Sequence, residues 1–95
     1  MDYRVIPSKQ VIKYLKKLKS KKLKNEFVYH IYDTIAQNPF IGQQKRGDLA
    51  GIWTYGFRMD KVDYRIAYKI TDEAVIPIIL CGAHENFYQE LKRLK

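Results

Sequence analysis

The sequence is poor in the features that stabilise secreted proteins or anchor membrane proteins. Cys81 is the one cysteine, so no internal disulfide can form, and its apolar surroundings favour a reducing compartment. No apolar stretch approaches the roughly 18–20 residues of a membrane helix. The short apolar segment near the start is broken by Pro7, which is not typical of a signal peptide. These absences predict a cytoplasmic protein with no membrane partner.

Acidic residues are also scarce. The chain has 10 Asp and Glu against 18 Lys and Arg, which leaves a formal net charge of +8. Such an excess repels itself in a compact state and is typical of proteins that bind a polyanion. RNA is the expected partner. A charge that only maintains solubility is the alternative, and an anionic membrane surface fits less well.

Several catalytic signatures are missing too. We find no His, Cys, Asp or Glu cluster at metal-ligand spacing, no glycine-rich phosphate loop and no Ser or Cys nucleophile arrangement. No metal and no cofactor are therefore expected. What is present is 95 residues that are 46% apolar and 14% aromatic, enough for a single domain over residues 1–95.

The N-terminal half predicts one strand followed by two helices. Residues 3–6 form a β-branched and aromatic run, and Ser8 is a suitable N-cap for a helix whose apolar residues recur at three- and four-residue spacing. After a break at 20–22, a second helix is expected to end at Asn38, because the residue before a proline disfavours the α conformation. Its buried face should consist of Phe27, Val28, Ile31 and Ile35.

The C-terminal half changes to a period of two. Strands are predicted over 52–59, 64–70 and 75–81, with turns at 60–63 and 71–74, a bulge near Pro77 and a helix over 84–95. The predicted fold is therefore α+β, in the order β-α-α-β-β-β with a C-terminal helix. Short turns between consecutive strands indicate an antiparallel sheet, which must pack against the helical pair.

The first hairpin suggests an anion site. A turn at 60–63 would place Arg58 directly opposite Arg65, on the face away from the aromatic residues. Two like charges across a strand pair are destabilising unless an anion lies between them, and arginine forks match phosphate oxygens. The predicted ligand is a phosphodiester. The alternative is that an arginine instead pairs with an acid: Asp60, Asp63 or Glu73.

Two residues after the last strand extend this hypothesis. His84 follows a Gly-Ala step, where an imidazole could give a proton to the leaving 5′-oxygen of a cleaved RNA. Tyr88 lies four residues further on and could stack on a base or hydrogen-bond to a phosphate. The alternatives are a capping or surface histidine and a tyrosine that packs on the sheet. His30, in the second helix, is expected to be structural.

The helix-forming lysines supply a broader basic surface. Seven lysines fall between Lys13 and Lys24. Lys13, Lys16 and Lys17 are candidate phosphate contacts, which would bind nucleic acid without reading its sequence. The alternative is an ordinary solvated helix face. Lys45 and Arg46 add positive charge to the long connection over residues 40–51.

Three segments together resemble the RelE/ParE superfamily of bacterial toxins: Gly47–Trp53 (GDLAGIW), Tyr64–Ile70 (YRIAYKI) and Ile79–Tyr88 (ILCGAHENFY). The likeness covers nearly the whole chain. It implies the toxin of a type II toxin–antitoxin system, with an antitoxin protein that wraps the basic surface. Many such toxins are ribosome-dependent endoribonucleases, which cut mRNA in the decoding site beside 16S ribosomal RNA and leave a 5′-hydroxyl.

The resemblance also implies roles for individual residues. Arg65 matches the phosphate-binding arginine of the middle strand, His84 stands where RelE-like nucleases have an arginine or histidine, and Tyr88 matches the aromatic residue that follows. Lys45 and Arg46 lie in the stretch where RelE has catalytic lysines.

The general base is not identified, because Gln43 is the nearest residue to the glutamate that YoeB-like members use. The nuclease branch, which includes RelE, YafQ and YoeB, is favoured because a gyrase poison needs no proton donor beside a phosphate site. ParE-type members poison DNA gyrase without cutting RNA, and a non-catalytic relative that binds RNA or antitoxin is a further alternative.

Overall fold

The computed structural model describes residues 3–94. The elements follow in the order β1 (Arg4–Pro7), α1 (Lys9–Lys17), α2 (Lys21–Tyr29), the π-helical η1 (His30–Ile35), the 3-10 helix η2 (Pro39–Ile41), β2 (Gln43–Gln44), the 3-10 helix η3 (Gly47–Leu49), β3 (Trp53–Met59), β4 (Val62–Tyr68), β5 (Val75–Ala83) and α3 (Phe87–Leu94). Lys95, the last residue of the predicted C-terminal helix, lies outside the described residues.

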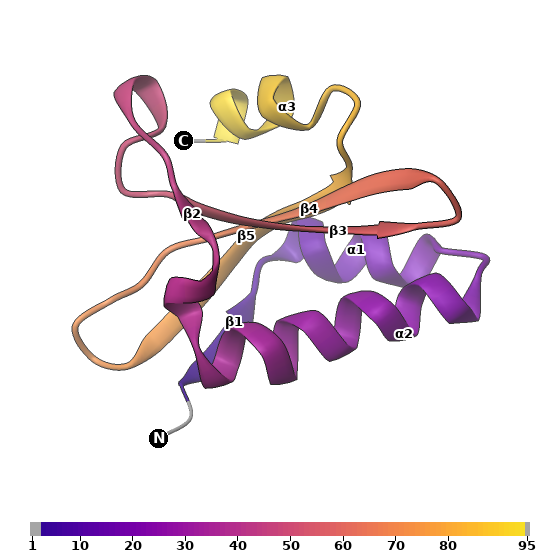
Figure 1. Ribbon diagram of the computed structural model, residues 1–95, viewed down its shortest axis with the longest axis horizontal. Helices are drawn as coiled ribbons and strands as arrows, with labels where there is room; N and C mark the ends of the chain where they lie inside the picture. The colour runs from indigo at the N-terminus through magenta and orange to yellow at the C-terminus, as the bar shows by residue number, and fades with distance from the viewer. Residues whose placement is uncertain (1–2, 95) are drawn as a thin grey trace.

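The elements form three layers, with the five-stranded sheet in the middle (Figure 1). The strand order is β1-β5-β4-β3-β2. Helices α1 and α2 cover one face over a core that contains Phe27, Ile31 and Tyr68, while α3 covers part of the other through Phe87 and Leu91. The predicted α+β order is confirmed. The parallel pairing of β1 with β5 was not predicted.

Both helices begin where a serine caps them. The Ser8 hydroxyl accepts a hydrogen bond from the Val11 N–H (3.2 Å) and donates one to the Ile79 carbonyl (2.8 Å), so it also ties α1 to β5. Ser20 accepts from the Leu23 N–H (3.1 Å) at the start of α2, which places the break slightly earlier than predicted. Val28 is exposed instead of lying on the predicted buried face. The buried face runs from Phe27 into the π-helical segment, where Ile31 and Ile35 are buried.

The hairpin between β3 and β4 corrects the predicted register. Only Asp60 and Lys61 form the turn, both with positive φ (51° and 68°), as a two-residue hairpin turn of type I′ requires. Arg58 therefore lies opposite Asp63, and Arg65 lies opposite Gly56. The shift amounts to two residues, so side-chain alternation is preserved and both arginines still leave the face away from the aromatic core.

The last strand and helix also differ in detail from the prediction. The bulge expected near Pro77 lies two residues further along, at Ile79, because Ala67 pairs with Leu80 but Tyr68 pairs with Ile78. Residues 84–86 form a turn instead of the first turn of α3, with Asn86 at a φ of 64°. Within residues 3–94, none of the helices has the length and apolar character needed to cross a membrane.

Candidate functional site

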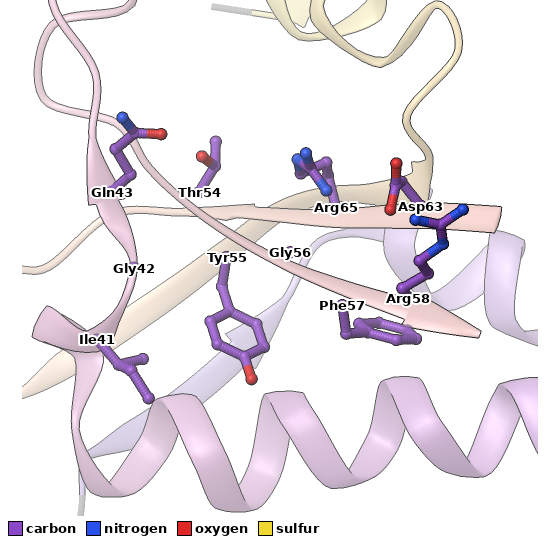
Figure 2. Close-up of a pocket in the computed structure, with 10 residues that line it drawn as sticks. All are labelled: Ile41, Gly42, Gln43, Thr54, Tyr55, Gly56, Phe57, Arg58, Asp63 and Arg65. Carbon is purple, nitrogen blue, oxygen red and sulfur yellow. The ribbon is translucent and has the colours of Figure 1, made fainter. Parts of the chain in front are cut away.

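An open groove of about 470 Å³ runs along the outer edge of β3 (Figure 2). It exists because β2 is only two residues long and pairs with Trp53 and Thr54 alone. Arg58 and Arg65 line the groove on the face that carries α3, whereas Tyr55 and Phe57 point toward α2 on the other face. The groove is thus basic on one side of the strand and aromatic on the other.

Arg65 is held close to the sheet by its neighbours. It lies between two glycines, Gly56 on β3 and Gly82 on β5. A Cβ atom at Gly56 would stand 2.9 Å from the Arg65 Cζ atom, so the guanidinium lies over the Gly56 backbone. Its Nη1 donates a hydrogen bond to the Tyr64 carbonyl at 3.2 Å, and the side chain remains partly accessible. A half-buried, oriented guanidinium of this kind can bind an anion from solvent.

Arg58 occupies the other end of the groove, where it faces an acid. Asp63 lies directly opposite in the register and also lines the groove, and Figure 2 shows the two side chains turned toward each other. The predicted Arg58–Arg65 pair across the strands is therefore wrong. The two arginines are diagonal neighbours on one face, and Asp63 offsets part of the charge of Arg58.

Next to the groove, Tyr88 is the centre of a second group of polar side chains. The Lys45 Nζ atom stands 4.9 Å from the centroid of its ring, and the His84 ring meets it edge-on with centroids 5.7 Å apart. Lys45 also donates a hydrogen bond to the Gln43 side chain (3.3 Å). Lys45 comes from the loop after β2, and His84 and Tyr88 come from the segment after β5.

These neighbours change the acidity of the Tyr88 phenol. Burial raises its pKa, but hydrogen bonding with Lys45 and Thr54, the charge of Lys45 and a weaker interaction with Arg65 together outweigh burial and lower the pKa below its ordinary value of 10.0. Thr54 and Arg65 both line the groove, so they connect the Tyr88 cluster to it. A phenol with two cations beside it releases its proton more readily than an isolated tyrosine, because the cations stabilise the phenolate.

The structure also shows two contributors that the sequence analysis missed. Thr54 is a polar residue that is only 4% exposed, and its side chain lies beside Tyr88. Gly56 provides the space for Arg65. A glycine inside a strand pattern often marks a close approach, so Gly56 left a usable signal in the sequence. Thr54 could not be singled out from the sequence, because threonine is common in strands.

The remaining predicted residues lie elsewhere. Arg46 is exposed at the start of η3. Lys13, Lys16 and Lys17 are exposed on α1, across the sheet from α3 (Figure 1). His30 is structural as predicted, with its ring stacked on Phe57 at 4.6 Å. The structure thus brings together Lys45, Arg65, Tyr88 and His84, and it separates them from the lysines of α1.

Solved structures with the same fold come from bacterial toxins. The RelBE2 toxin–antitoxin complex from Mycobacterium tuberculosis aligns with a TM-score of 0.75 at 23% identity, covering 88% of this chain and 100% of that chain. A mutant of the toxin RelE from E. coli, in which two arginines are replaced by alanine, was solved in the free state. It aligns with a TM-score of 0.73 at 21% identity over 100% of both chains. The intact RelBE toxin–antitoxin complex from E. coli aligns with a TM-score of 0.62 at 18% identity, covering 84% of this chain and 94% of that chain.

The family comparison agrees with the fold. No curated protein matches the sequence. The model of the ParE-like toxin of type II bacterial toxin–antitoxin systems matches residues 5–92, which is nearly the whole chain. With this match and the fold it shares with RelE, the chain belongs to the RelE/ParE superfamily of type II toxins.

Proposed function

We propose that this toxin is an endoribonuclease that cleaves mRNA on the ribosome and thereby inhibits translation. The observation that carries the proposal is the gathering of Lys45, Arg65 and His84 around the Tyr88 ring, beside an open basic groove. These side-chain types supply phosphate binding and proton transfer, the two requirements for cleaving RNA through its own 2′-hydroxyl.

The proposed reaction is an attack of the 2′-oxygen on the adjacent phosphorus. A bond forms between them, the bond from phosphorus to the 5′-oxygen breaks, and the products are a 2′,3′-cyclic phosphate and a 5′-hydroxyl. Arg65 holds the phosphate and stabilises the extra negative charge that develops on it. His84, exposed at the end of β5, donates the proton that the leaving 5′-oxygen takes up.

Lys45 and Tyr88 have supporting roles in this scheme. Lys45 neutralises charge near the phosphate, and Tyr88 positions the phosphate or an adjacent base. The lowered pKa of Tyr88 also makes its phenolate a candidate for taking the 2′ proton. Gln43, which is hydrogen-bonded to Lys45, cannot act as that base because an amide does not titrate.

The remaining positive charge serves docking in this proposal. Arg46, Arg58 and the lysines at positions 13, 16 and 17 would contact mRNA or 16S ribosomal RNA in the cytoplasm, and an antitoxin would cover part of the same surface. Two of the similar structures are toxin–antitoxin complexes, which supports an antitoxin partner. A net charge of +8 suits either kind of partner.

A DNA gyrase poison is the second candidate function. The matching family is described as ParE-like toxins, and the resemblance set out above implies that ParE-type members poison DNA gyrase without cutting RNA. A gyrase poison would need the basic surface but would not depend on proton transfer by His84.

In vitro translation with primer extension on the message separates the two functions. The wild-type protein should cut the message, and His84→Ala and Arg65→Ala should each reduce the rate by on the order of 10²–10³. Glu85→Ala, an exposed change beside His84, is the control that should leave the rate unchanged. An intact message together with inhibited gyrase supercoiling would refute the nuclease and establish the second candidate.

A further inference from the structure

The groove along β3 has an aromatic half to which the proposed reaction gives no role. Arg58 and Arg65 line the groove from the face of the sheet that carries α3, whereas Tyr55, Phe57 and Ile41 line it from the face toward α2 (Figure 2). The first half suits a phosphate and the second suits a flat, apolar group. Both halves belong to one groove, so they can contact a single ligand that carries both kinds of group.

Tyr55 is the ring of this half that is available to a ligand. Phe57 is stacked with His30 (centroids 4.6 Å apart, planes at 26°) and with Tyr64 (5.4 Å and 25°), so internal packing occupies its ring. Tyr55 packs against His30 at 5.2 Å with the planes tilted by 44°, and it still lines the groove. Its ring is thus supported by His30 and accessible from the groove.

Ile41 supplies the second apolar wall, on a segment that is firmly held. Its side chain lines the groove and the residue is 48% exposed. Just before it, the Pro39 carbonyl accepts a 2.7 Å hydrogen bond from the Tyr68 hydroxyl. Just after it, Gly42 lies so close to the sheet that a Cβ atom there would stand 2.6 Å from the Thr54 carbonyl oxygen. We name the space between Tyr55 and Ile41 the aromatic slot.

Gly56 leaves a low passage between the aromatic slot and Arg65. It follows Tyr55 on β3 and pairs with Arg65 on β4, so it stands between the two halves of the groove. Having no side chain, it separates them by backbone alone. Within the described residues, β2 pairs only with Trp53 and Thr54, so the outer edge of β3 is uncovered at Gly56. A flexible ligand can therefore cross the edge of the sheet at this residue.

We infer that the aromatic slot binds one unpaired nucleobase of the RNA strand whose phosphate lies on Arg65. A nucleotide joins an anionic phosphate to a flat ring, which matches the two halves of the groove. Bases of single-stranded RNA splay out and stack on aromatic side chains, and such stacking tolerates any base. The strand crosses the sheet edge at Gly56, with its phosphate on the basic face and its base against Tyr55.

This inference rests on the proposed function for the identity of the ligand and adds a second contact to the same site. It also gives the groove a basis for selecting its substrate. A base in a duplex cannot enter the aromatic slot without leaving its partner, so the slot favours single-stranded RNA over double-stranded RNA.

The first test is NMR spectroscopy of the whole chain with a hexanucleotide that has one adenine among uracils. Every ribose carries a 2′-O-methyl group, which removes the attacking hydroxyl, so binding is measured without cleavage. Nuclear Overhauser effects should join the adenine protons to the ring protons of Tyr55 and to the methyl groups of Ile41. The same strand annealed to its complement should give none of these contacts.

The second test measures the affinity of variants for the same hexanucleotide. Tyr55→Leu should weaken binding by on the order of tenfold, which is within the range that base–aromatic stacking contributes. Tyr55→Phe keeps the ring and should bind like the wild type. Tyr32→Leu removes an exposed aromatic ring from η1, outside the groove, and should change the affinity by less than about threefold.

A hexamer of abasic riboses with the same charge separates stacking from a loss of folding. Tyr55→Leu should leave the affinity for this strand unchanged. Equal weakening of both strands would overturn the inference, as would adenine contacts to Tyr88 in place of Tyr55, which would put the base on the other face of the sheet. Cleavage of a message without the Tyr55 contacts would refute this inference alone, and the contacts without cleavage would refute the nuclease alone.

Discussion

Gly56 on β3 lies directly opposite Arg65 on β4, and the Arg65 guanidinium occupies the space that any other residue would fill with its side chain. The arginine is therefore folded flat over the sheet, where its Nη1 reaches the Tyr64 carbonyl. The orientation of the strongest phosphate-binding candidate depends on the absence of one methyl group in the neighbouring strand.

Substitution of Gly56 by alanine should displace Arg65 while leaving the fold intact. The new Cβ would stand 2.9 Å from the Arg65 Cζ atom, so the guanidinium must move away. RNA cleavage should fall by on the order of 10², because small misplacements of a catalytic group have effects of that size. The measurement is primer extension on a translated message, with circular dichroism as the check on folding.

Gly82→Ala is the matched control for that experiment. Gly82 also lies opposite Arg65, but a Cβ there meets only the Tyr14 ring at 3.9 Å, an ordinary contact. Cleavage should be nearly unchanged in this variant. Equal losses in the two variants would mean that Arg65 does not act through the space over Gly56.

The second prediction concerns the ionisation of Tyr88. Its phenol should titrate below the ordinary value of 10.0, because Lys45, Thr54 and Arg65 together outweigh burial. Lys45→Met removes a cation and should raise the Tyr88 pKa, while Lys69→Met should not change it. Carbon-13 NMR of the tyrosine Cζ atoms resolves individual residues and gives each pKa; an unchanged Tyr88 value in Lys45→Met would contradict the assignment.

The stability of the folded protein at alkaline pH should depend on Tyr68. Burial, as the largest cause, raises the pKa of this phenol to about 12, whereas the ordinary value is 10.0. The folded state thus holds the proton more tightly, so this group's contribution to stability is complete below pH 10. It is lost as the pH rises from 10 toward 12.

Tyr68→Phe tests that dependence. Below pH 10 the variant should be less stable by about 1–3 kcal/mol, because the buried hydroxyl no longer donates its 2.7 Å hydrogen bond to the Pro39 carbonyl. Urea unfolding at a series of pH values should show this difference shrinking above pH 10. A difference that stays constant up to pH 12 would rule out the proposed ionisation of Tyr68.

Cys81 should be unreactive in the folded protein. The thiol is 3% exposed, and burial raises its pKa to about 12 from 9.0. Because the thiolate is the reactive form, its fraction at neutral pH falls by on the order of a thousandfold. Iodoacetamide should label the chain fully in guanidinium chloride and very slowly without it; fast labelling of the native protein would show that β5 opens locally.

Much of the fold could be predicted from local sequence patterns, because those patterns act over a few residues. Ser8 was expected to begin a helix and does, through its hydrogen bond to Val11. The alternation from Trp53 onward correctly placed the aromatic residues on one face of the sheet and both arginines on the other. Cys81, which stands in an apolar run of the sequence, is likewise buried in the core.

The register of the first hairpin could not be predicted in the same way. Two-residue turns usually contain asparagine or glycine, and Asp60-Lys61 gives no such signal although both residues adopt positive φ. The four-residue turn expected instead placed Arg58 opposite the wrong partner. The predicted face of both arginines is nevertheless correct, because a register shift of two residues leaves every side chain on the same face of the sheet.

The sequence by itself determined the positive charge, the order of the longer helices and strands and the face on which Arg65 emerges, because each follows from composition or from a short period. Only the tertiary structure decided that Lys45, Tyr88 and Arg65 meet, that β1 closes the sheet beside β5, and that β2 stops early enough to leave β3 open. These relationships join segments far apart in the chain. Their geometry depends on how layers pack, which no local pattern encodes.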